Sequence, residues 1–406
     1  MISSYRFDAG LRGIVQGIGC VRERLADELI AQGVQRPMIV CGAFVKESPA
    51  FDIVYDAVEQ AIGESPLVFA KSRPHSPSDA IEEGARIADT DRVDAIVAVG
   101  GSSAIDSAKG IAVLLATGTD RVSGLTPAAP GALSAPNLAA AGNSSIPLFT
   151  ATTTLSYAEF YPFWGTRRSD TGAKAGYGDH GVVSRTVFLD GEIAASTPDN
   201  VWFETAIKSF DDALLLYLRS GGNEPFLDPL LTSGMRGVLD HLPSSLMGAV
   251  AERQHVLTAM ALTKYGAPRL QPGFQSDWFA RAVRYALGSR YDLPHGVGTC
   301  IALTQGLRLH RATTEARQAS LVDALGLRSD ATDRREPIDV LVDTFGALLD
   351  TLGLPRSLDE FDLSDRQVDI VIDDITRSMP GLGDRATISD AIAMLRTRPG
   401  QVSSRK

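Results

Sequence analysis

The stretch from Arg92 to Leu115 constrains the fold of this chain more than any other. It begins with Ala95–Val99, an apolar run of strand length and β-branched character, and passes through a Gly-Gly-Ser-Ser turn into a helical pattern with one apolar side. The free N–H groups of a first helical turn and the helix dipole both favour an anion at such a turn. The stretch therefore predicts a phosphate-binding turn, although Gly-Gly-Ser alone would equally suit an ordinary strand-to-helix connection.

Short strands alternate with helices through the first half of the chain. Strand patterns at 37–41, 67–69, 146–150 and 185–189 accompany helical patterns at 50–62 and 77–87, and residues 11–32 form a glycine-containing turn followed by an amphipathic helix. Alternation of this kind predicts an α/β fold with a parallel sheet. After Pro198 the pattern is helical at nearly every turn. We therefore expect one domain over residues 1–196 and an all-helical second domain over residues 197–406.

Composition excludes several classes of protein. The net charge is −10, from 39 basic and 49 acidic residues, and no basic run is present, so we expect no nucleic-acid partner. No apolar run reaches membrane length, and Met1–Phe7 does not resemble a signal peptide, so we expect no membrane association. Three scattered cysteines suit the reducing cytoplasm and form neither a disulfide framework nor a zinc pattern.

Three motifs carry a resemblance to a known family. The string from Gly100 to Lys109, GGSSAIDSAK, resembles the GGGSxxDxAK signature of the iron-containing (group III) alcohol dehydrogenases, with Ser102 in place of the third glycine. The pair Thr153-Thr154 resembles the threonine pair of the family's cofactor loop, although Thr152 stands where proline is usual. The tripeptide Pro-His295-Gly resembles the segment that holds the family's last metal-binding histidine.

This resemblance covers nearly the whole chain and implies a two-domain enzyme. A Rossmann-like N-terminal domain would bind NAD or NADP, an all-helical C-terminal domain would carry the catalytic residues, and a cleft would lie between them. Family members transfer hydride between the nicotinamide cofactor and a small alcohol or aldehyde, and they often form homodimers. The cofactor-binding residues implied here are Gly42, Gly100, Gly101, Ser102, Ser103, Asp106, Lys109, Thr153 and Thr154.

The chain departs from the family at the metal site. Most members hold a divalent metal with one aspartate and three histidines. Aligned with them, this chain has Lys208, Asp212, Arg281 and His295 at those positions, and Tyr285 where a further family histidine stands. A cation prefers neutral or anionic ligands, and two of these four residues are positively charged. We therefore expect no bound metal.

The replaced positions remain polar, which leaves two interpretations. Lys208 and Asp212 are one helical turn apart and can form an ion pair that merely cross-links the helix, with a contribution of about 0.5 kcal/mol if exposed. Alternatively, Lys208 and Arg281 stabilise the negative charge that hydride transfer builds on a carbonyl oxygen, and Tyr285 or His295 moves the proton. Two cations also suit a carboxylate-bearing substrate. We favour the second interpretation, because all the changes fall at one expected site.

These observations favour a metal-independent, NAD(P)H-dependent oxidoreductase. The alternatives are a cyclase or lyase similar to dehydroquinate synthase, which uses bound NAD transiently, and a family member without catalysis. Gly42 follows the strand pattern at the position where NAD-preferring relatives often place an aspartate for the adenosine ribose. Glycine does not repel a 2′-phosphate, so we expect NADPH to be accepted or preferred.

Overall fold

The computed structural model describes residues 13–127, 137–138, 145–220, 224–265, 277–330 and 332–396. These residues fall into two compact units. The first contains the described residues up to Asp199 and again from 244 to 265, and the second contains residues 200–243 and 277–396. Packing thus assigns helix α10 (Val250–Tyr265) to the first unit, whereas the predicted boundary between residues 196 and 197 assigns it to the second.

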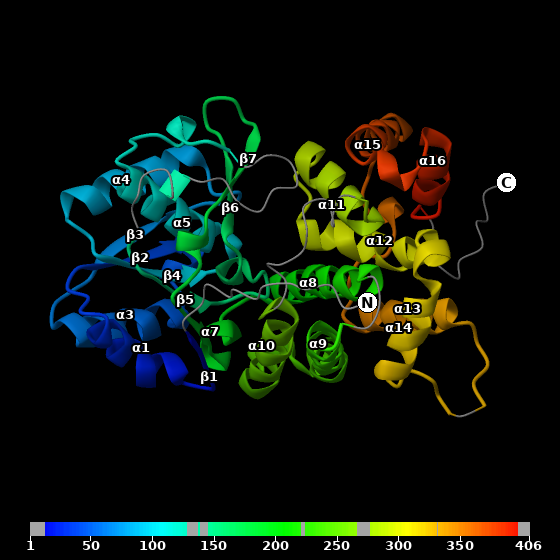
Figure 1. Ribbon diagram of the computed structural model, residues 1–406, viewed down its shortest axis with the longest axis horizontal. Helices are drawn as coiled ribbons and strands as arrows, with labels where there is room; N and C mark the ends of the chain where they lie inside the picture. Colours follow the sequence, from blue (N-terminus) through cyan, green and yellow to red (C-terminus); the bar gives the residue numbers. More distant parts are fainter. Residues whose placement is uncertain are drawn as a thin grey trace. The chain divides into compact units, whose positions relative to one another are not determined.

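A six-stranded sheet forms the centre of the first unit. All neighbouring strands are parallel, and their order is β1 (Gly13–Gln16), β8 (Thr186–Leu189), β5 (Leu148–Thr152), β4 (Ala95–Gly100), β2 (Pro37–Gly42) and β3 (Leu67–Ser72). Helices α1 (Cys20–Ala31) and α3 (Pro49–Ile62) cover one face, and α4 (Ser78–Thr90) and α5 (Ser102–Thr117) cover the other (Figure 1). The predicted α/β architecture is confirmed.

The central strand β4 explains why its sequence reads as an unbroken apolar run. All six of its residues are buried. Val97 and Val99 pack with α1 and α3, whereas Ile96 and Ala98 pack with α4 and α5, because successive side chains of a strand point to opposite faces. A parallel sheet covered on both faces therefore needs apolar residues at every position.

Smaller elements complete the first unit. An antiparallel pair, β6 (Phe163–Arg167) and β7 (Lys174–Gly178), packs against α5 through β6. The short helices are α2 (Ala43–Lys46) and α7 (Gly191–Ala195), and α7 packs against α10. The buried Arg253 of α10 donates to the carbonyl oxygens of Ala194 and Thr197, both at 2.6 Å. These bonds fix α10 against α7 and the residues that follow it.

The second unit is helical in all its described residues, apart from turns. Its helices are α8 (Asp199–Arg219, which begins one residue before the unit), α9 (Leu227–His241), α11 (Phe279–Arg290), α12 (His295–Leu309), α13 (Arg311–Ala324), α14 (Pro337–Thr351), α15 (Asp365–Ser378) and α16 (Arg385–Ala393). Phe210 of α8 meets Phe345 of α14 edge to face at 5.0 Å in its core. The predicted helical half is therefore confirmed.

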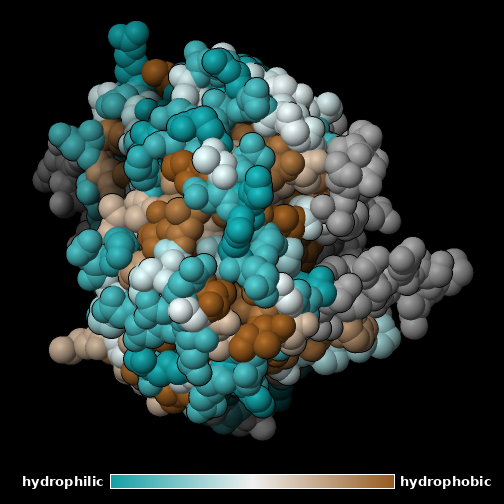
Figure 2. Space-filling view, turned by 90° about the vertical axis from the view of Figure 1, so that its left-hand side faces the viewer, coloured by the Kyte–Doolittle hydropathy of each residue, from teal (hydrophilic) through white to brown (hydrophobic). Residues whose placement is uncertain are grey.

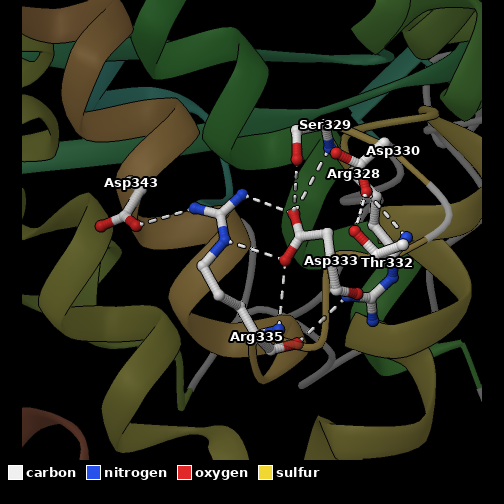
Figure 3. A network of polar contacts seen from close by, with 7 residues as sticks. All are labelled: Arg328, Ser329, Asp330, Thr332, Asp333, Arg335 and Asp343. Carbon is white, nitrogen blue, oxygen red and sulfur yellow. Dashed lines mark hydrogen bonds and ion pairs between the residues drawn. The ribbon is translucent and has the colours of Figure 1, made fainter.

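A polar network holds the turn between α13 and α14 (Figure 3). The Asp333 carboxylate binds the Arg335 guanidinium at 2.7 Å, and Arg335 also reaches Asp343 of α14 at 3.1 Å. Arg328 donates to the carbonyl oxygens of Asp333 and Arg335 at 3.0 and 3.1 Å. The hydrogen bond from the Arg335 side chain lowers the pKa of Asp333, so this carboxylate is charged in the folded protein at neutral pH.

The described surface shows no sign of a membrane-spanning element. Among the helices that the structure describes, none combines the length and the apolar character needed to cross a bilayer. The face in Figure 2 is mostly hydrophilic, with small apolar patches between polar side chains. Apolar residues scattered in this way are ordinary on a protein surface.

Candidate active site

Two neighbouring strands of the first unit end in glycine at the same edge of the sheet. Strand β2 ends at Gly42 and pairs in parallel with β4, which ends at Gly100. The chain leaves β2 for β3 on one side and leaves β4 for β5 on the other, so the strand order reverses between them. Open α/β sheets bind ligands beyond the carboxyl ends of the strands at such a reversal. Gly42 and Gly100 thus flank the expected nucleotide crevice.

The turn after β4 requires glycine at both positions. Gly100 has φ +141°, and a Cβ there would lie 3.0 Å from the Ala104 Cβ. A Cβ on Gly101 would lie 2.8 Å from the Thr154 hydroxyl oxygen. The Thr153 N–H donates to the Gly100 carbonyl oxygen at 3.1 Å. The structure therefore brings together the two predicted cofactor loops, which are about fifty residues apart in the sequence.

Helix α5 starts directly at this turn, at Ser102, and no side chain caps its first N–H groups. Ser102 is exposed and Ser103 is half-buried. The Ser103 carbonyl oxygen accepts hydrogen bonds from the hydroxyls of Ser76 at 3.0 Å and Ser107 at 2.8 Å, which hold the first turn of the helix. Uncapped N–H groups at the start of a long helix suit a pyrophosphate, so these residues fit NAD or NADP.

Lys109 and Asp106 have a positioning role in this arrangement. Lys109 is fully buried, and its ammonium donates to the carbonyl oxygens of Ala158 at 2.6 Å, Tyr161 at 2.6 Å and Phe163 at 3.0 Å. Asp106 accepts from the Gly165 N–H at 3.1 Å. Both side chains thus tie the segment after the threonine loop to α5, and the Lys109 charge faces backbone carbonyls instead of a ligand.

Glu159, which follows the threonine loop, is a buried group that was not among the predicted site residues. Its side chain is fully buried, and neither carboxyl oxygen accepts a hydrogen bond from a described residue. Burial raises its pKa to about 7, and the charge of Lys109 opposes this effect only in part. Burial likewise lowers the pKa of Lys109 to about 8. Glu159 and Lys109 therefore form a buried pair of ionisable groups next to the threonine loop.

The second unit brings the predicted catalytic residues into one cluster on α8, α11 and α12. The Lys208 ammonium binds the Asp212 carboxylate at 2.9 Å, which confirms the predicted ion pair. The Arg281 guanidinium carbon lies 4.9 Å from the centre of the Tyr285 ring. The Tyr285 and His295 rings meet edge to face at 5.1 Å. Arg281 makes no hydrogen bond or ion pair to any residue in the described part of the chain.

Arg284 joins this cluster and was not among the predicted residues. Its guanidinium is buried, donates to Asp212 at 2.9 Å and lies 3.6 Å from Asp211. One sequence signal points to it. Arg284 falls on the apolar side of α11 with Ala280, Val283 and Leu287, where a charged residue must have a buried partner.

Glycines allow the three helices to approach closely at the cluster. A Cβ on Gly296 of α12 would lie 2.5 Å from the carbonyl oxygen of Glu204 in α8. A Cβ on Gly298 would lie 2.7 Å from the Arg284 Cα in α11. Any larger side chain would separate the helices, so these glycines set the spacing on which the cluster depends.

The cluster has an excess of positive charge around Tyr285. The Arg281 charge lowers the pKa of the Tyr285 phenol most, and Arg284 and Lys208 lower it further, while burial and the Asp212 carboxylate oppose them. Tyr285 remains 41% exposed, so solvent weakens each of these effects. A phenol surrounded by cations is a better acid than an ordinary tyrosine, and it suits proton donation.

The same residues do not fit a divalent metal. Each oxygen of the Asp212 carboxylate already binds a cation, Lys208 on one side and Arg284 on the other. Arg281 adds a further positive charge beside Tyr285, whose ring contacts that of His295. In the described ranges, no three His, Cys, Asp or Glu side chains are grouped as metal ligands would be. A metal would have to displace two bound cations and enter a positively charged site.

Comparisons with known proteins agree with this architecture. Residues 12–191 match the family description "Iron-containing alcohol dehydrogenase", and residues 209–387 match its C-terminal counterpart, "Fe-containing alcohol dehydrogenase family, C-terminal". A relative named "Probable NADH-dependent butanol dehydrogenase 1" from Bacillus subtilis is 23% identical over 86% of this chain and 88% of its own.

Solved structures share the fold over nearly the full length. A 1,3-propanediol oxidoreductase superposes with a TM-score of 0.83 at 17% identity, covering 96% of this chain and 100% of the other. A sulfoacetaldehyde reductase from Bifidobacterium kashiwanohense, solved in complex with NAD+, gives 0.81 at 18% identity, with 97% and 99% covered. The chain therefore belongs to the iron-containing alcohol dehydrogenase family and is an oxidoreductase of that family.

Proposed function

We propose that the protein reduces an aldehyde or ketone with NADPH or NADH, or oxidises the matching alcohol, without a bound metal. The observation that carries this proposal is the occupied Asp212 carboxylate, which lies between Lys208 at 2.9 Å and Arg284 at 2.9 Å where the family has a metal ligand. The family, the glycine turn and the threonine loop support a nicotinamide cofactor. When bound, that cofactor would supply or accept the hydride.

Lys208 and Arg281 are the groups that would stabilise the substrate oxygen. Reduction of a carbonyl places negative charge on oxygen, and fixed cations lower the energy of that charge without reorganising. Asp212 holds the Lys208 ammonium by its ion pair and leaves its other N–H bonds free to donate. Arg281 is half-buried and can turn its guanidinium toward a ligand.

Tyr285 and His295 are the candidate proton donors. Their rings meet edge to face, so the two groups lie side by side in the cluster. The Arg281 charge lowers the pKa of the Tyr285 phenol, which makes Tyr285 a better proton donor than an ordinary tyrosine. In the oxidation direction the same group would accept the proton.

We also propose that the substrate carries an anionic group. Arg281 has no carboxylate partner among the described residues, whereas Arg284, one helical turn away, has two. A guanidinium binds a carboxylate or sulfonate with two parallel hydrogen bonds. A structural relative named as a sulfoacetaldehyde reductase acts on an anionic aldehyde, which supports this proposal without establishing it.

NADPH is the cofactor that we expect to be accepted or preferred. Gly42 ends β2, and no carboxylate stands at that position to repel a 2′-phosphate. A homodimer is also expected. β1 is an edge strand of the sheet, with Ile14 and the following Ile18 exposed, and light scattering showing a monomer at working concentration would remove this part of the proposal.

A substrate scan tests the proposed function. The loss of nicotinamide absorbance would be followed with NADPH and NADH against pairs of aldehydes matched in length, one neutral and one carrying a carboxylate. We expect turnover with the anionic member, lower turnover in Lys208→Ala, and a raised KM for the anionic member alone in Arg281→Ala. Turnover unchanged in both variants would contradict the assigned roles, and no turnover with any carbonyl would favour the cyclase or non-catalytic alternatives.

A further inference from the structure

Arg284 stands at the centre of an alternating chain of charges. The Trp278 indole N–H donates to Asp211 at 2.8 Å, Asp211 lies 3.6 Å from Arg284, Arg284 binds Asp212 at 2.9 Å, and Asp212 binds Lys208 at 2.9 Å. The chain of contacts runs from the buried start of α11 to the partly exposed Lys208 on α8. It links the two helices through a single guanidinium.

Burial makes this guanidinium a fixed feature of the site. A buried charge is tolerated only with counter-charges and hydrogen bonds. Arg284 has a counter-charge and a hydrogen bond from Asp212 and a second counter-charge from Asp211. Those carboxylates raise its pKa further, against the effect of burial, so it stays protonated at every pH at which the protein folds. The positive charge therefore needs no metal ion to supply it.

Close packing restricts the direction of the Arg284 side chain. Gly298 of α12 lies against the Arg284 Cα, where an added Cβ would come within 2.7 Å. The backbone of α11 cannot move toward α12, and the side chain extends instead to α8 and to the edge of Tyr285, whose ring centre is 5.8 Å from the guanidinium carbon. Arg284 thus contacts Asp212, which binds Lys208, and lies beside the ring of Tyr285.

The count of charges shows what Arg284 contributes. Lys208, Arg281 and Arg284 are three positive groups, Asp211 and Asp212 are two negative groups, and the sum is one positive charge beside Tyr285. His295 is a further titratable group beside the phenol, and its ring meets that of Tyr285 edge to face. Without Arg284, two positive and two negative groups remain, and their charges sum to zero.

We propose that Arg284 is a positioning residue, a permanent internal cation that takes the place of a metal ion as the cross-link between α8 and α11. It fixes Asp212, and through Asp212 the Lys208 ammonium, and it places a second guanidinium beside the Tyr285 ring. This inference rests on the proposed function for its catalytic consequence, but the cross-link and the charge beside Tyr285 can be measured without turnover.

The test compares Arg284→Met, Arg284→Lys and the control Arg317→Met. Arg317 is a mostly buried arginine of the same unit that stacks on Tyr217 at 3.7 Å and binds Asp228 at 2.7 Å, away from the cluster. The phenol of Tyr285 would be titrated by its near-ultraviolet absorbance, as the difference between each protein and its Tyr285→Phe counterpart. Thermal midpoints would be recorded with a chelator and with added zinc.

We expect Arg284→Met to raise the pH midpoint of the Tyr285 titration by roughly one pH unit, because a positive charge beside the phenol is lost. The same variant should lower the thermal midpoint. Arg284→Lys should return the Tyr285 titration midpoint to that of the unaltered protein, because lysine keeps the charge. It should recover only part of the loss in thermal midpoint, because lysine cannot bind both carboxylates. Arg317→Met should lower the thermal midpoint and leave the titration of Tyr285 in place. Should Arg284→Met fail to fold, the Arg284→Lys titration decides alone.

Three results would overturn the proposal. The first is a Tyr285 titration that is the same in Arg284→Met as in the unaltered protein. The second is a titration midpoint of Tyr285 in Arg284→Lys that is raised as much as we expect for Arg284→Met, although lysine keeps the charge. The third is a thermal midpoint of the unaltered protein that rises on zinc addition and falls on chelation. Absence of turnover with every carbonyl would contradict the proposed function while leaving these three measurements intact.

Discussion

Replacing Glu159 by glutamine should change how the stability of the first unit depends on pH. The Glu159 carboxyl is fully buried beside the Lys109 ammonium and accepts no hydrogen bond from a described residue. Burial therefore disfavours its charged form and raises its pKa from 4.5 to about 7. Glutamine has a similar shape and cannot ionise, so the variant removes this titration.

The sign and size follow from the two pKa values. A carboxyl with a higher pKa in the folded state binds its proton more tightly there, so its contribution is fully present below pH 4.5 and is lost as the pH rises to about 7. The difference of about 2.5 units corresponds to about 3 kcal/mol at 1.36 kcal/mol per unit. Lys109 titrates near pH 8, above this window.

Urea unfolding between pH 4 and pH 8 measures the effect, with hydrogen exchange of β4 and β5 peptides reporting the first unit alone. The free energy of unfolding of the unaltered protein should fall by about 3 kcal/mol relative to Glu159→Gln across the window. Glu83→Gln is the control, because it removes only an exposed ion pair with Lys71. A constant difference between Glu159→Gln and the unaltered protein would refute the reasoning.

Two further predictions concern the cofactor and the α13–α14 turn. Gly42→Asp should weaken NADPH binding by roughly tenfold or more and leave NADH binding nearly unchanged, because a carboxylate repels the 2′-phosphate. Gly42→Asn is the control for the added side chain, since a Cβ there lies 3.1 Å from the Ser72 carbonyl oxygen. Equal losses of affinity for both cofactors in Gly42→Asp would contradict the prediction. Asp333→Asn should lower the thermal midpoint at pH 7. This difference in thermal midpoint should shrink as the pH falls below about 4, because the Arg335 side chain depresses the Asp333 pKa and protonation of Asp333 removes the ion pair. A difference in thermal midpoint that does not change with pH would contradict the prediction.

Local patterns were sufficient for the elements that the sequence predicted well. Strand β4 is recognisable because a strand buried on both faces must be apolar throughout, and the residues that follow it are glycines because the turn has no room for Cβ atoms. The Lys208–Asp212 pair is likewise local, since residues four apart on a helix are neighbours.

Long-range contacts account for what the sequence could not predict. The Lys109 ammonium is bound by carbonyl oxygens that lie about fifty residues later, so the motif suggested a ligand contact where the structure shows a backbone contact. Arg284 depends on a carboxylate 72 residues earlier in the chain. Helix α10 belongs to the first unit through Arg253 and its contacts with the segment near Thr197, which no helical periodicity reveals.

The most direct test of metal independence is turnover in protein whose metal content is known. NADPH-dependent reduction of an anionic aldehyde would be measured before dialysis against a chelator, after dialysis, and after adding zinc or iron, with Lys208→Ala assayed in parallel. We expect the same turnover in all three states, and in Lys208→Ala a lower turnover with nearly unchanged NADPH binding. Activity that disappears on chelation and returns with zinc or iron would contradict this expectation.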